Sequence, residues 1–213
     1  MSRGRFVSLE GGEGCGKSTQ ALLLAEWLRD EGVPVTLTRE PGGTPGAEAI
    51  RRLLLDPPKG EWDAPAEALL FAAARSDHVA RLIDPALATG NWVVCDRFLD
   101  SSVAYQGAAS GLGNDTVHTL HRIGSGGLMP DLTILLRLDE DTASARVSLR
   151  DAGGGDAISG RDANYHRKVA NAFIAMAESE PRRWMVVDAS GTPEQVHDRV
   201  RAAVEPLFHH RDR

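Results

Sequence analysis

The sequence predicts an α/β fold in which helices cover a parallel β-sheet. Short apolar runs alternate with longer amphipathic runs along the chain, which is the pattern of such a sheet. The short runs contain many β-branched residues, and this composition favours strand over helix. Five strands are expected, at Phe6–Leu9, Val35–Thr38, Trp92–Cys95, Leu132–Leu136 and Met185–Val187.

The longer runs between these strands have helical spacing. Apolar residues from Leu22 to Leu28 fall on or near one face of a helix. Gly32 and Gly90 stand where helices should end before the next strand. The expected helices are Ser18–Asp30, Thr44–Leu55, Pro65–Leu87, Asp115–Gly124, Asp139–Arg150, Ala163–Glu178 and Pro193–Leu207.

Length and composition predict one domain that spans residues 1–213. At roughly 100–200 residues per domain, 213 residues leave room for one full hydrophobic core. The Gly-rich stretch DAGGGDAISG at 151–160 breaks the pattern, and it suits either a linker or a mobile flap over a site. Because the flanking elements belong to one domain by their pattern, a flap at about residues 146–162 is favoured.

The net charge and the cysteine content disfavour nucleic-acid binding, membrane binding, a disulfide framework and a zinc site. The formal net charge is −6, so no global basic field would attract nucleic acid or an anionic membrane. A phosphate-bearing partner must therefore meet local cations, which favours a small nucleotide in a pocket. Cys15 and Cys95 match neither a disulfide framework nor a zinc motif and are expected to be buried thiols. The absence of a signal peptide and of any apolar run near 18 residues predicts a soluble, cytoplasmic protein.

Residues 11–18, GGEGCGKS, match the phosphate-binding pattern G-x-x-x-x-G-K-[ST] between an expected strand and an expected helix. Glycines let backbone N–H groups curl around a phosphate, and the helix N-terminus adds its positive end. Lys17 is expected to contact the β- and γ-phosphates, and the Ser18 hydroxyl to ligate Mg²⁺. The predicted triphosphate-binding residues are Gly11, Gly12, Glu13, Gly14, Cys15, Gly16, Lys17, Ser18 and Thr19.

An acidic residue ends a second expected strand. Asp96 directly follows Trp92–Cys95, and Arg97 comes next. Asp96 can hold Mg²⁺ directly or through water, and Arg97 then points at a phosphate beside the metal. A salt-bridged strand end is the structural alternative for this pair.

Arginines outside the phosphate loop bear on the reaction. An ATPase must activate water, whereas a kinase needs a second anion site that brings two phosphates together against their repulsion. Arg39 and Arg97 both follow strands expected to flank the first strand, so they face the crevice where ligands bind in such sheets. Arg51 fits solvated surface as well as a site. The pattern favours phosphoryl transfer to a phosphorylated acceptor.

Several motifs resemble those of the bacterial thymidylate kinases, and they run over nearly the whole chain. The long and specific stretch TREPGGTP occupies positions 38–45. The other matching stretches are FVSLEG at 6–11, KSTQ at 17–20, FAAARSDH at 71–78, DRFLDSSVAYQG at 96–107, PDLT at 130–133 and VDAS at 187–190.

This resemblance implies a fold, a reaction and partners. The fold would be the P-loop NTPase type, a three-layer α/β/α arrangement with a doubly wound, five-stranded parallel sheet and a short flap (LID) segment. The reaction would be ATP-dependent phosphorylation of dTMP to dTDP with Mg²⁺, in a homodimer without nucleic-acid or membrane partners. The alternatives are another pyrimidine nucleotide or nucleoside kinase, and a P-loop ATP-binding protein with no phosphoryl acceptor.

The resemblance also implies roles around the phosphate and sugar of the acceptor. Arg97 would hold the dTMP phosphate with Arg39 nearby, and both would act with Lys17 in catalysis. Glu13 would reach the 3′-hydroxyl of the sugar. Tyr105 would crowd the 2′-position and so favour deoxyribose, with plain packing as its structural alternative.

A second group of implied roles concerns the base. Phe71 would stack on thymine, with plain core packing as its structural alternative. Arg75 would donate to a thymine carbonyl, because a fork of donors suits that edge of the base. Ser102 and Gln106 would line the base pocket.

The sequence departs from the family pattern in two places. Some members of the family place a catalytic arginine at the positions of residues 12–15, and those that lack it supply one from the flap. Residues 12–15 include no Lys or Arg here, so the resemblance implies that an arginine from the flap lies near the γ-phosphate. The usual flap sequence Asp-Arg-x-Glu falls on 156–159, where Ala157 and Ser159 replace the arginine and the glutamate. Ser110 stands where the family commonly has arginine. The candidate flap arginines are Arg146, Arg150 and Arg161, and Arg150 is taken as the catalytic one.

Overall fold

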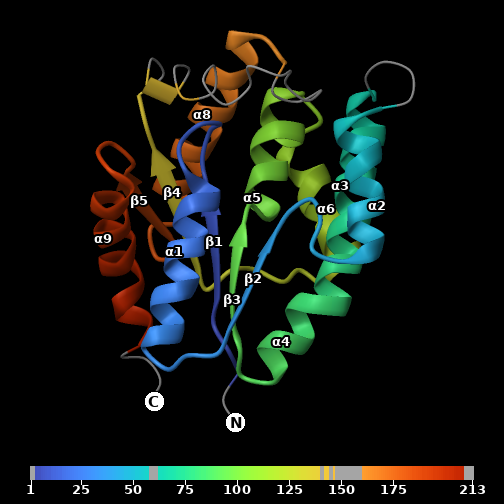
Figure 1. The fold of residues 1–213 in the computed structure, drawn as a ribbon. Coiled ribbons are helices and arrows are strands. Elements are labelled where there is room, and N and C mark those ends of the chain that lie inside the picture. Colours follow the sequence, from blue (N-terminus) through green and yellow to red (C-terminus); the bar gives the residue numbers. More distant parts are fainter. Residues whose placement is uncertain (1–2, 58–61, 140–141, 144–145, 147–159, 209–213) are drawn as a thin grey trace.

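The fold is a five-stranded parallel sheet with helices on both faces (Figure 1). The computed structural model describes residues 3–57, 62–139, 142–143, 146 and 160–208. The strand order is β2-β3-β1-β4-β5, and every neighbouring pair is parallel. This confirms the predicted α/β fold. The strands are β1 (Phe6–Glu10), β2 (Val35–Arg39), β3 (Trp92–Asp96), β4 (Leu132–Arg137) and β5 (Trp184–Asp188).

The central strand β1 is buried along its whole length. Its side chains alternate between two hydrophobic cores, because successive side chains of a strand point to opposite faces of the sheet. Val7 and Leu9 pack in the core beneath α1 (Lys17–Asp30) and α9 (Pro193–Val204). Phe6 lies on the other face, where its ring meets that of Phe98 edge to face with centroids 4.8 Å apart.

The other helices surround the second face and the β2 edge of the sheet (Figure 1). Two of the helical segments have π-helical geometry, which widens the turn by one residue. These segments are α2 (Pro45–Leu55), α3 (Ala64–His78), the π-helix η1 (Val79–Ile83), α4 (Asp84–Ala88), α5 (Leu99–Ser102), the π-helix η2 (Val103–Ala109), α6 (Asn114–Ser125) and α8 (Ala163–Ser179). The 3₁₀ turn η3 (Glu205–Leu207) follows α9, and Leu207 packs against the core of the first face.

Side-chain caps set where several helices begin. Asp63 and Asp162 accept hydrogen bonds from the backbone N–H groups of Ala66 (2.9 Å) and Tyr165 (2.7 Å). Thr192 opens α9 in a capping box with the residue at the third helical position. These caps satisfy N–H groups that have no partner within the helix. The helices therefore start within one residue of the positions that the sequence predicts.

One predicted helix differs from the structure, and one helical run of the structure was not predicted. A single α-helix over Pro65–Leu87 is wrong, because η1 interrupts it. Pro85 lacks an N–H and its ring clashes with the carbonyl four residues earlier, so the regular hydrogen-bond ladder cannot pass through it. The helical run from Leu99 to Ala109 was not predicted. The predicted helix Asp139–Arg150 and the flap at 146–162 lie largely outside the described residues.

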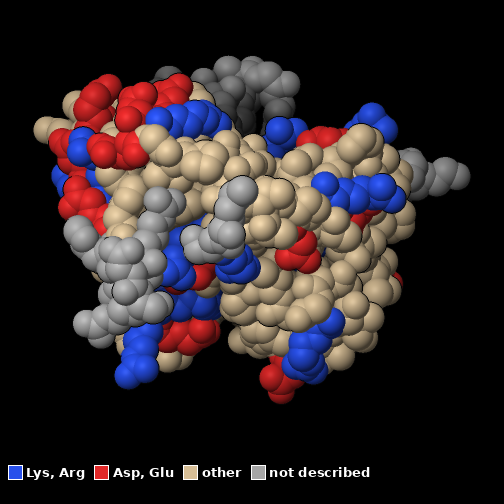
Figure 2. Space-filling view, turned by 90° about the horizontal axis from the view of Figure 1, so that it is seen from below, with Lys and Arg blue, Asp and Glu red and all other residues tan. Residues whose placement is uncertain are grey.

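The surface carries mixed charge. On the face shown in Figure 2, acidic and basic side chains lie next to one another, and a broad area carries neither. This distribution agrees with the net charge of −6 and with the absence of one strong basic field on that face. In the part of the chain that the structure describes, none of the helices combines the length and apolarity needed to span a bilayer.

Candidate active site

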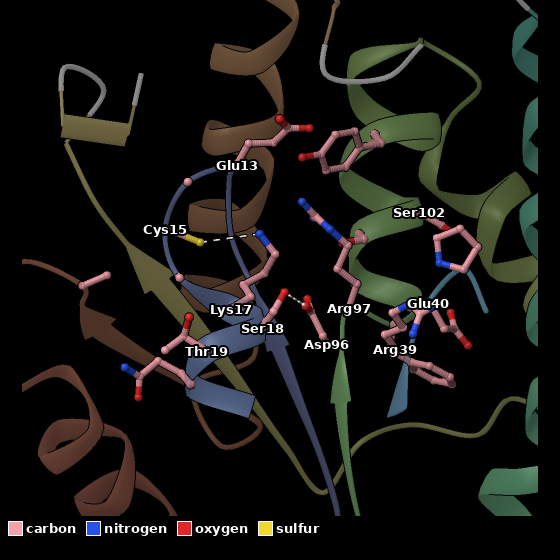
Figure 3. Close-up of a pocket in the computed structure, with 18 of the residues that line it drawn as sticks. Glu13, Cys15, Lys17, Ser18, Thr19, Arg39, Glu40, Asp96, Arg97 and Ser102 are labelled. Atoms are coloured by element: carbon pink, nitrogen blue, oxygen red, sulfur yellow. Dashed lines mark hydrogen bonds between the residues drawn. The ribbon is translucent and has the colours of Figure 1, made fainter. Parts of the chain in front are cut away.

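The candidate site lies at the carboxyl edge of the sheet, between β1 and β3. These strands are neighbours, with Leu9 paired to Asp96, but the chain leaves them for helices on opposite faces. A crevice opens at such a switch point. A cavity of about 890 Å³ occupies it (Figure 3). Of the residues predicted for the site, the cavity is lined by Glu13, Gly14, Cys15, Gly16, Lys17, Ser18, Thr19, Arg39, Phe71, Arg75, Asp96, Arg97, Ser102, Tyr105 and Gln106.

The phosphate loop joins β1 to α1 and depends on glycine for its shape. Gly16 caps the helix at φ 91°, a left-handed conformation that favours glycine. Gly11 has φ 138°, and a Cβ there would lie 2.5 Å from the carbonyl oxygen of Leu136. Lys17 turns back over the loop, where its Nζ donates to the carbonyl oxygens of Gly11 (3.1 Å) and Gly12 (2.6 Å). Gly11 and Gly12 were also predicted to bind the triphosphate. They form part of the loop but do not line the cavity.

The two predicted metal ligands meet at the start of α1. The Ser18 hydroxyl donates to Asp96 Oδ2 at 2.5 Å (Figure 3). One hydroxyl and one carboxylate are hard oxygen ligands, which suit Mg²⁺ when phosphates and waters complete its shell. Among the described residues there is no cluster of three or more His, Cys, Asp or Glu side chains that could hold a metal. The pair therefore fits a magnesium ion carried with a nucleotide.

Arg97 follows β3 with a positive φ of 69°, unusual for a residue other than glycine. This backbone conformation directs its side chain at the phosphate loop, where Nη1 donates to Gly11 O (3.2 Å) and Ser101 Oγ (3.0 Å). The guanidinium also lies 5.2 Å from the ring centroid of Tyr105. Burial disfavours its charge, but nearby Tyr105 and acidic groups outweigh burial and raise the pKa of Arg97 above its usual range. Arg97 is therefore a fixed cation in the cavity.

The carboxyl group of Glu10 is buried next to the residues that hold Arg97. Glu10 accepts hydrogen bonds from Phe98 N (2.7 Å) and from Ser101 Oγ (2.6 Å). Burial raises the pKa of Glu10 to about 8, and the negative charge of Asp100 adds to the effect. Since Ser101 contacts both Glu10 and Arg97, this carboxyl group helps to place the arginine.

A second buried network fixes Arg75. Its Nε donates to Glu40 Oε2 (2.7 Å), and its Nη2 donates to Ser102 Oγ (2.8 Å). Glu40 Oε1 also contacts His78 Nδ1 at 3.0 Å, and His78 Nε2 lies 2.7 Å from Thr38 Oγ1. All of these side chains are almost inaccessible to solvent. Buried ion pairs with satisfied hydrogen bonds hold their members in one geometry, so Arg75 presents a fixed edge to the cavity.

Two further arginines reach the cavity from the β2 side. Arg39 forms a half-exposed ion pair with Glu48 at 2.8 Å. Arg51 donates from Nη1 to the carbonyl oxygen of Pro41 at 2.6 Å. From the sequence, Arg51 fitted either a solvated surface position or a position in the site. In the structure it lines the cavity. Arg39, Arg51 and Arg97 therefore give the cavity a group of cations separate from Lys17.

The predicted flap arginines have different positions. Arg146 lines the cavity. Arg161 does not line it, because its guanidinium is paired with Glu67 and also donates to the Tyr165 hydroxyl. Arg150 and the substituted positions Ala157 and Ser159 lie outside the described residues. Ser110 lies beside Tyr165, with 3.3 Å between the two hydroxyl oxygens.

Sequence reasoning missed several residues that shape the site. Glu10, Glu40 and His78 were seen only as members of motifs, and their contacts were not anticipated. An acidic residue that ends an apolar strand, as Glu10 does, is a signal of a buried and paired carboxylate. The cavity also extends to the start of α9, where it is lined by Gly191, Pro193 and Val196. None of these three residues belongs to a sequence motif that indicates a ligand-binding site.

Comparison with known proteins agrees with this geometry. A sequence model of the thymidylate kinase family matches residues 9–200. The chain is 53% identical over 205 residues to a thymidylate kinase of Rhizorhabdus wittichii strain RW1, which covers 96% of this chain and 99% of that protein. A thymidylate kinase of Symbiobacterium thermophilum is 46% identical over 208 residues, covering 98% of this chain and 96% of the relative.

A solved structure shows the same likeness. The crystal structure of thymidylate kinase from Ehrlichia chaffeensis matches with a TM-score of 0.77 and 30% sequence identity. The match covers 96% of this chain and 99% of that one. A phosphate loop, a facing group of arginines and full-length similarity thus agree, and this chain belongs to the thymidylate kinase family.

Proposed function

We propose that the chain transfers the γ-phosphoryl group of ATP to dTMP and releases ADP and dTDP. The observation that carries this proposal is the pairing of two cation groups in one cavity of about 890 Å³. Lys17 and the phosphate loop suit a triphosphate, and Arg39 and Arg97 suit the phosphate of an acceptor. Membership of the thymidylate kinase family supports the choice of substrates.

Catalysis rests on positioning and charge neutralisation. An oxygen of the dTMP phosphate attacks the γ-phosphorus of ATP, and the bond from that phosphorus to the β,γ-bridging oxygen breaks. The attacking phosphate oxygen carries no proton, so no general base is required. Lys17 and Arg97 converge on the space between the loop and η2 (Figure 3), where they offset the repulsion between the two anions.

The acceptor pocket is assigned to the remaining lining residues. Phe71 stacks on thymine, and the fixed edge of Arg75 donates to a base carbonyl. Ser102 and Gln106 complete the base pocket. Glu13 faces the sugar 3′-hydroxyl, and Tyr105 crowds the 2′-position.

Residues 11–19 would cradle the triphosphate, and Ser18 and Asp96 would hold Mg²⁺. The metal supplies charge neutralisation between phosphates when it is bound. The flap at 146–162 contributes a further arginine near the γ-phosphate, with Arg150 as the assigned residue and Arg146 as the one that lines the cavity. We further propose one domain over residues 1–213 and a cytoplasmic location.

The protein is proposed to act as a homodimer. Three neighbouring helices carry large apolar side chains that are exposed to solvent: Leu53 on α2, Leu69 on α3 and Ile123 on α6. Leu69 is 57% exposed and Ile123 is 79% exposed. Exposed apolar side chains on adjacent helices are typical of a surface that a partner covers.

A coupled assay of ADP release, with ATP and Mg²⁺, tests the function. We expect turnover that depends strongly on dTMP and is weak with dCMP, AMP or thymidine. Turnover that appears only with another monophosphate or with thymidine would indicate a different nucleotide or nucleoside kinase. ADP release that does not depend on an acceptor would indicate an ATP-binding protein that hydrolyses ATP.

A further inference from the structure

A buried carboxylate lies next to the base pocket and has no role in the reaction as proposed. Glu67 of α3 is only 4% exposed. Its Oε1 accepts a hydrogen bond from Gln106 Nε2 at 2.7 Å, and its Oε2 is paired with Arg161. Glu67 therefore connects a residue of the cavity wall to a residue at the start of α8.

The pairing sets the orientation of the Gln106 amide. A carboxylate that is paired with an arginine has only acceptors, so the group that Gln106 turns towards it must be the NH₂. The carbonyl oxygen of the same amide is then left as the acceptor that Gln106 can offer to a ligand. Gln106 is buried and lines the cavity, and its contact with Glu67 is the one hydrogen bond that its amide makes to the described part of the chain.

Arg161, which lies just before the N-cap of α8, holds this arrangement in place. Its guanidinium contacts the Tyr165 hydroxyl and lies 4.6 Å from the centroid of that ring. Tyr165 in turn donates to the carbonyl oxygen of Tyr105 at 3.0 Å. Tyr105 and Gln106 are consecutive residues of η2, so both are anchored by the contacts that converge on Arg161.

Gln106 and Arg75 together define a hydrogen-bonding pattern. Arg75 has donors only, and its Nη1 makes no hydrogen bond to the described part of the chain. Gln106, held by Glu67, offers an acceptor. Thymine and uracil carry an acceptor at O4 beside the N3–H donor, whereas cytosine carries a donor at N4 beside an acceptor at N3. The donor of Arg75 and the acceptor of Gln106 therefore match the hydrogen-bonding groups of thymine and uracil. They do not match those of cytosine, in which the donor and the acceptor are exchanged.

We propose that Glu67, held by Arg161, is a positioning residue that sets selectivity for thymine and uracil over cytosine by fixing the amide of Gln106. This inference rests on the proposed function, because it concerns the base of the acceptor nucleotide. Substituting glutamine for Glu67 replaces an acceptor-only group with an amide that both donates and accepts. Gln106 could then turn either end to the cavity.

The test compares kcat/KM for dTMP, dUMP and dCMP in the wild type and in Glu67→Gln. We expect the dTMP-over-dCMP ratio to fall at least about tenfold, while the dTMP-over-dUMP ratio stays unchanged. Each ratio comes from one preparation, so it does not depend on the folded fraction of the variant. Glu178→Gln, which changes an exposed carboxylate on α8, serves as the matched control and should leave both ratios unchanged.

Gln106→Met completes the test, because it removes the amide that Glu67 is proposed to orient. Its dTMP-over-dCMP ratio should also fall, and adding Glu67→Gln to it should produce no further change. A wild-type ratio in either single variant, or a further fall in the double variant, would overturn the proposal. If Glu67→Gln does not fold, Gln106→Met still tests the proposal, because a wild-type dTMP-over-dCMP ratio in that variant would overturn it. If ADP release by the wild-type enzyme does not depend on dTMP, the proposed function itself is refuted.

Discussion

Several charged residues of this site are wholly or partly buried, and specific partners hold each of them. Arg97 contacts Gly11 and Ser101, and Ser101 contacts Glu10. A buried charge is tolerated when hydrogen bonds and opposite charges compensate for the lost solvent. The same contacts keep each group in the geometry that phosphate binding requires, so removing one residue affects its neighbours.

Two replacements of Arg97 should distinguish the contribution of its guanidinium to catalysis from the effect of its backbone conformation on stability. Arg97→Ala and Arg97→Gly both remove the guanidinium, and we expect kcat/KM for dTMP to fall on the order of 100-fold or more in each. At φ 69° the glycine variant avoids a left-handed strain that alanine retains, so it should be more stable by about 1 kcal/mol. Steady-state kinetics and chemical denaturation measure the two effects. Near-normal turnover in Arg97→Ala would contradict the assigned role.

Glu10 should give the stability of the protein a distinctive pH dependence. Its pKa is raised from 4.5 to about 8 in the folded chain, so between these values the native state holds a proton that the unfolded state has released. The free energy of unfolding should therefore decrease as pH rises through this window. Glu10→Gln should make that slope less negative, by up to about 1 kcal/mol per pH unit.

Urea denaturation at pH 5.5, 6.5 and 7.5 measures this slope. Glu178→Gln is the control, since an exposed carboxylate on α8 should leave the slope unchanged. Equal slopes in Glu10→Gln and in the wild type would show that Glu10 is ionised over the whole range.

Among the structural elements, the loop between β2 and α2 illustrates close packing around the site. Gly43 has φ 89°, and a Cβ there would lie 2.5 Å from Thr38 Oγ1 and 2.6 Å from His78 Nε2. His78 contacts Glu40, which holds Arg75. The glycine thus gives the loop the space to approach the network that fixes the base-pocket arginine.

Gly43→Ala should lower the free energy of unfolding more than Gly32→Ala, because the added methyl group has free space only at position 32. Gly32 also has a positive φ, 76°, but a Cβ there would meet nothing within 4 Å. We expect Gly32→Ala to cost about 1 kcal/mol from backbone strain, and Gly43→Ala to cost roughly 2 kcal/mol or more because His78 must also move. Gly43→Ala should in addition raise KM for dTMP. Similar destabilisation of the two variants would argue against the close packing at Gly43.

Across the whole molecule, the exposed apolar side chains on α2, α3 and α6 predict an oligomer. Ile123→Glu combined with Leu69→Glu should shift the protein from dimer to monomer in sedimentation equilibrium at micromolar concentration. A charge in a buried apolar interface loses its hydration without gaining a partner. Leu22→Glu on α1 is the matched control, since Leu22 is also exposed but lies on a helix of the other face of the sheet. A wild type that is monomeric would refute the homodimer.

Much of the molecule could be predicted from local patterns in the sequence. The five strands and the helix after the phosphate loop appear where the apolar periodicity placed them. The phosphate loop was predicted because its residues are contiguous. The long helix that begins at α3 was predicted as regular, because periodicity does not register the π-helical turn that Pro85 requires. The short segments α5 and η2 were missed for a related reason, since their residues are nearly all buried and show no amphipathic face.

The sequence by itself determined the sheet, the phosphate loop and the types of residue available for phosphate and base recognition, because each depends on neighbouring residues. Only the tertiary structure decided how distant residues combine. Gln106 and Glu67 are 39 positions apart, and Glu67 and Arg161 are 94 apart. No local pattern encodes such pairs, because they arise when α3, η2 and α8 pack together. The residues that hold the site in shape are therefore visible only in the fold.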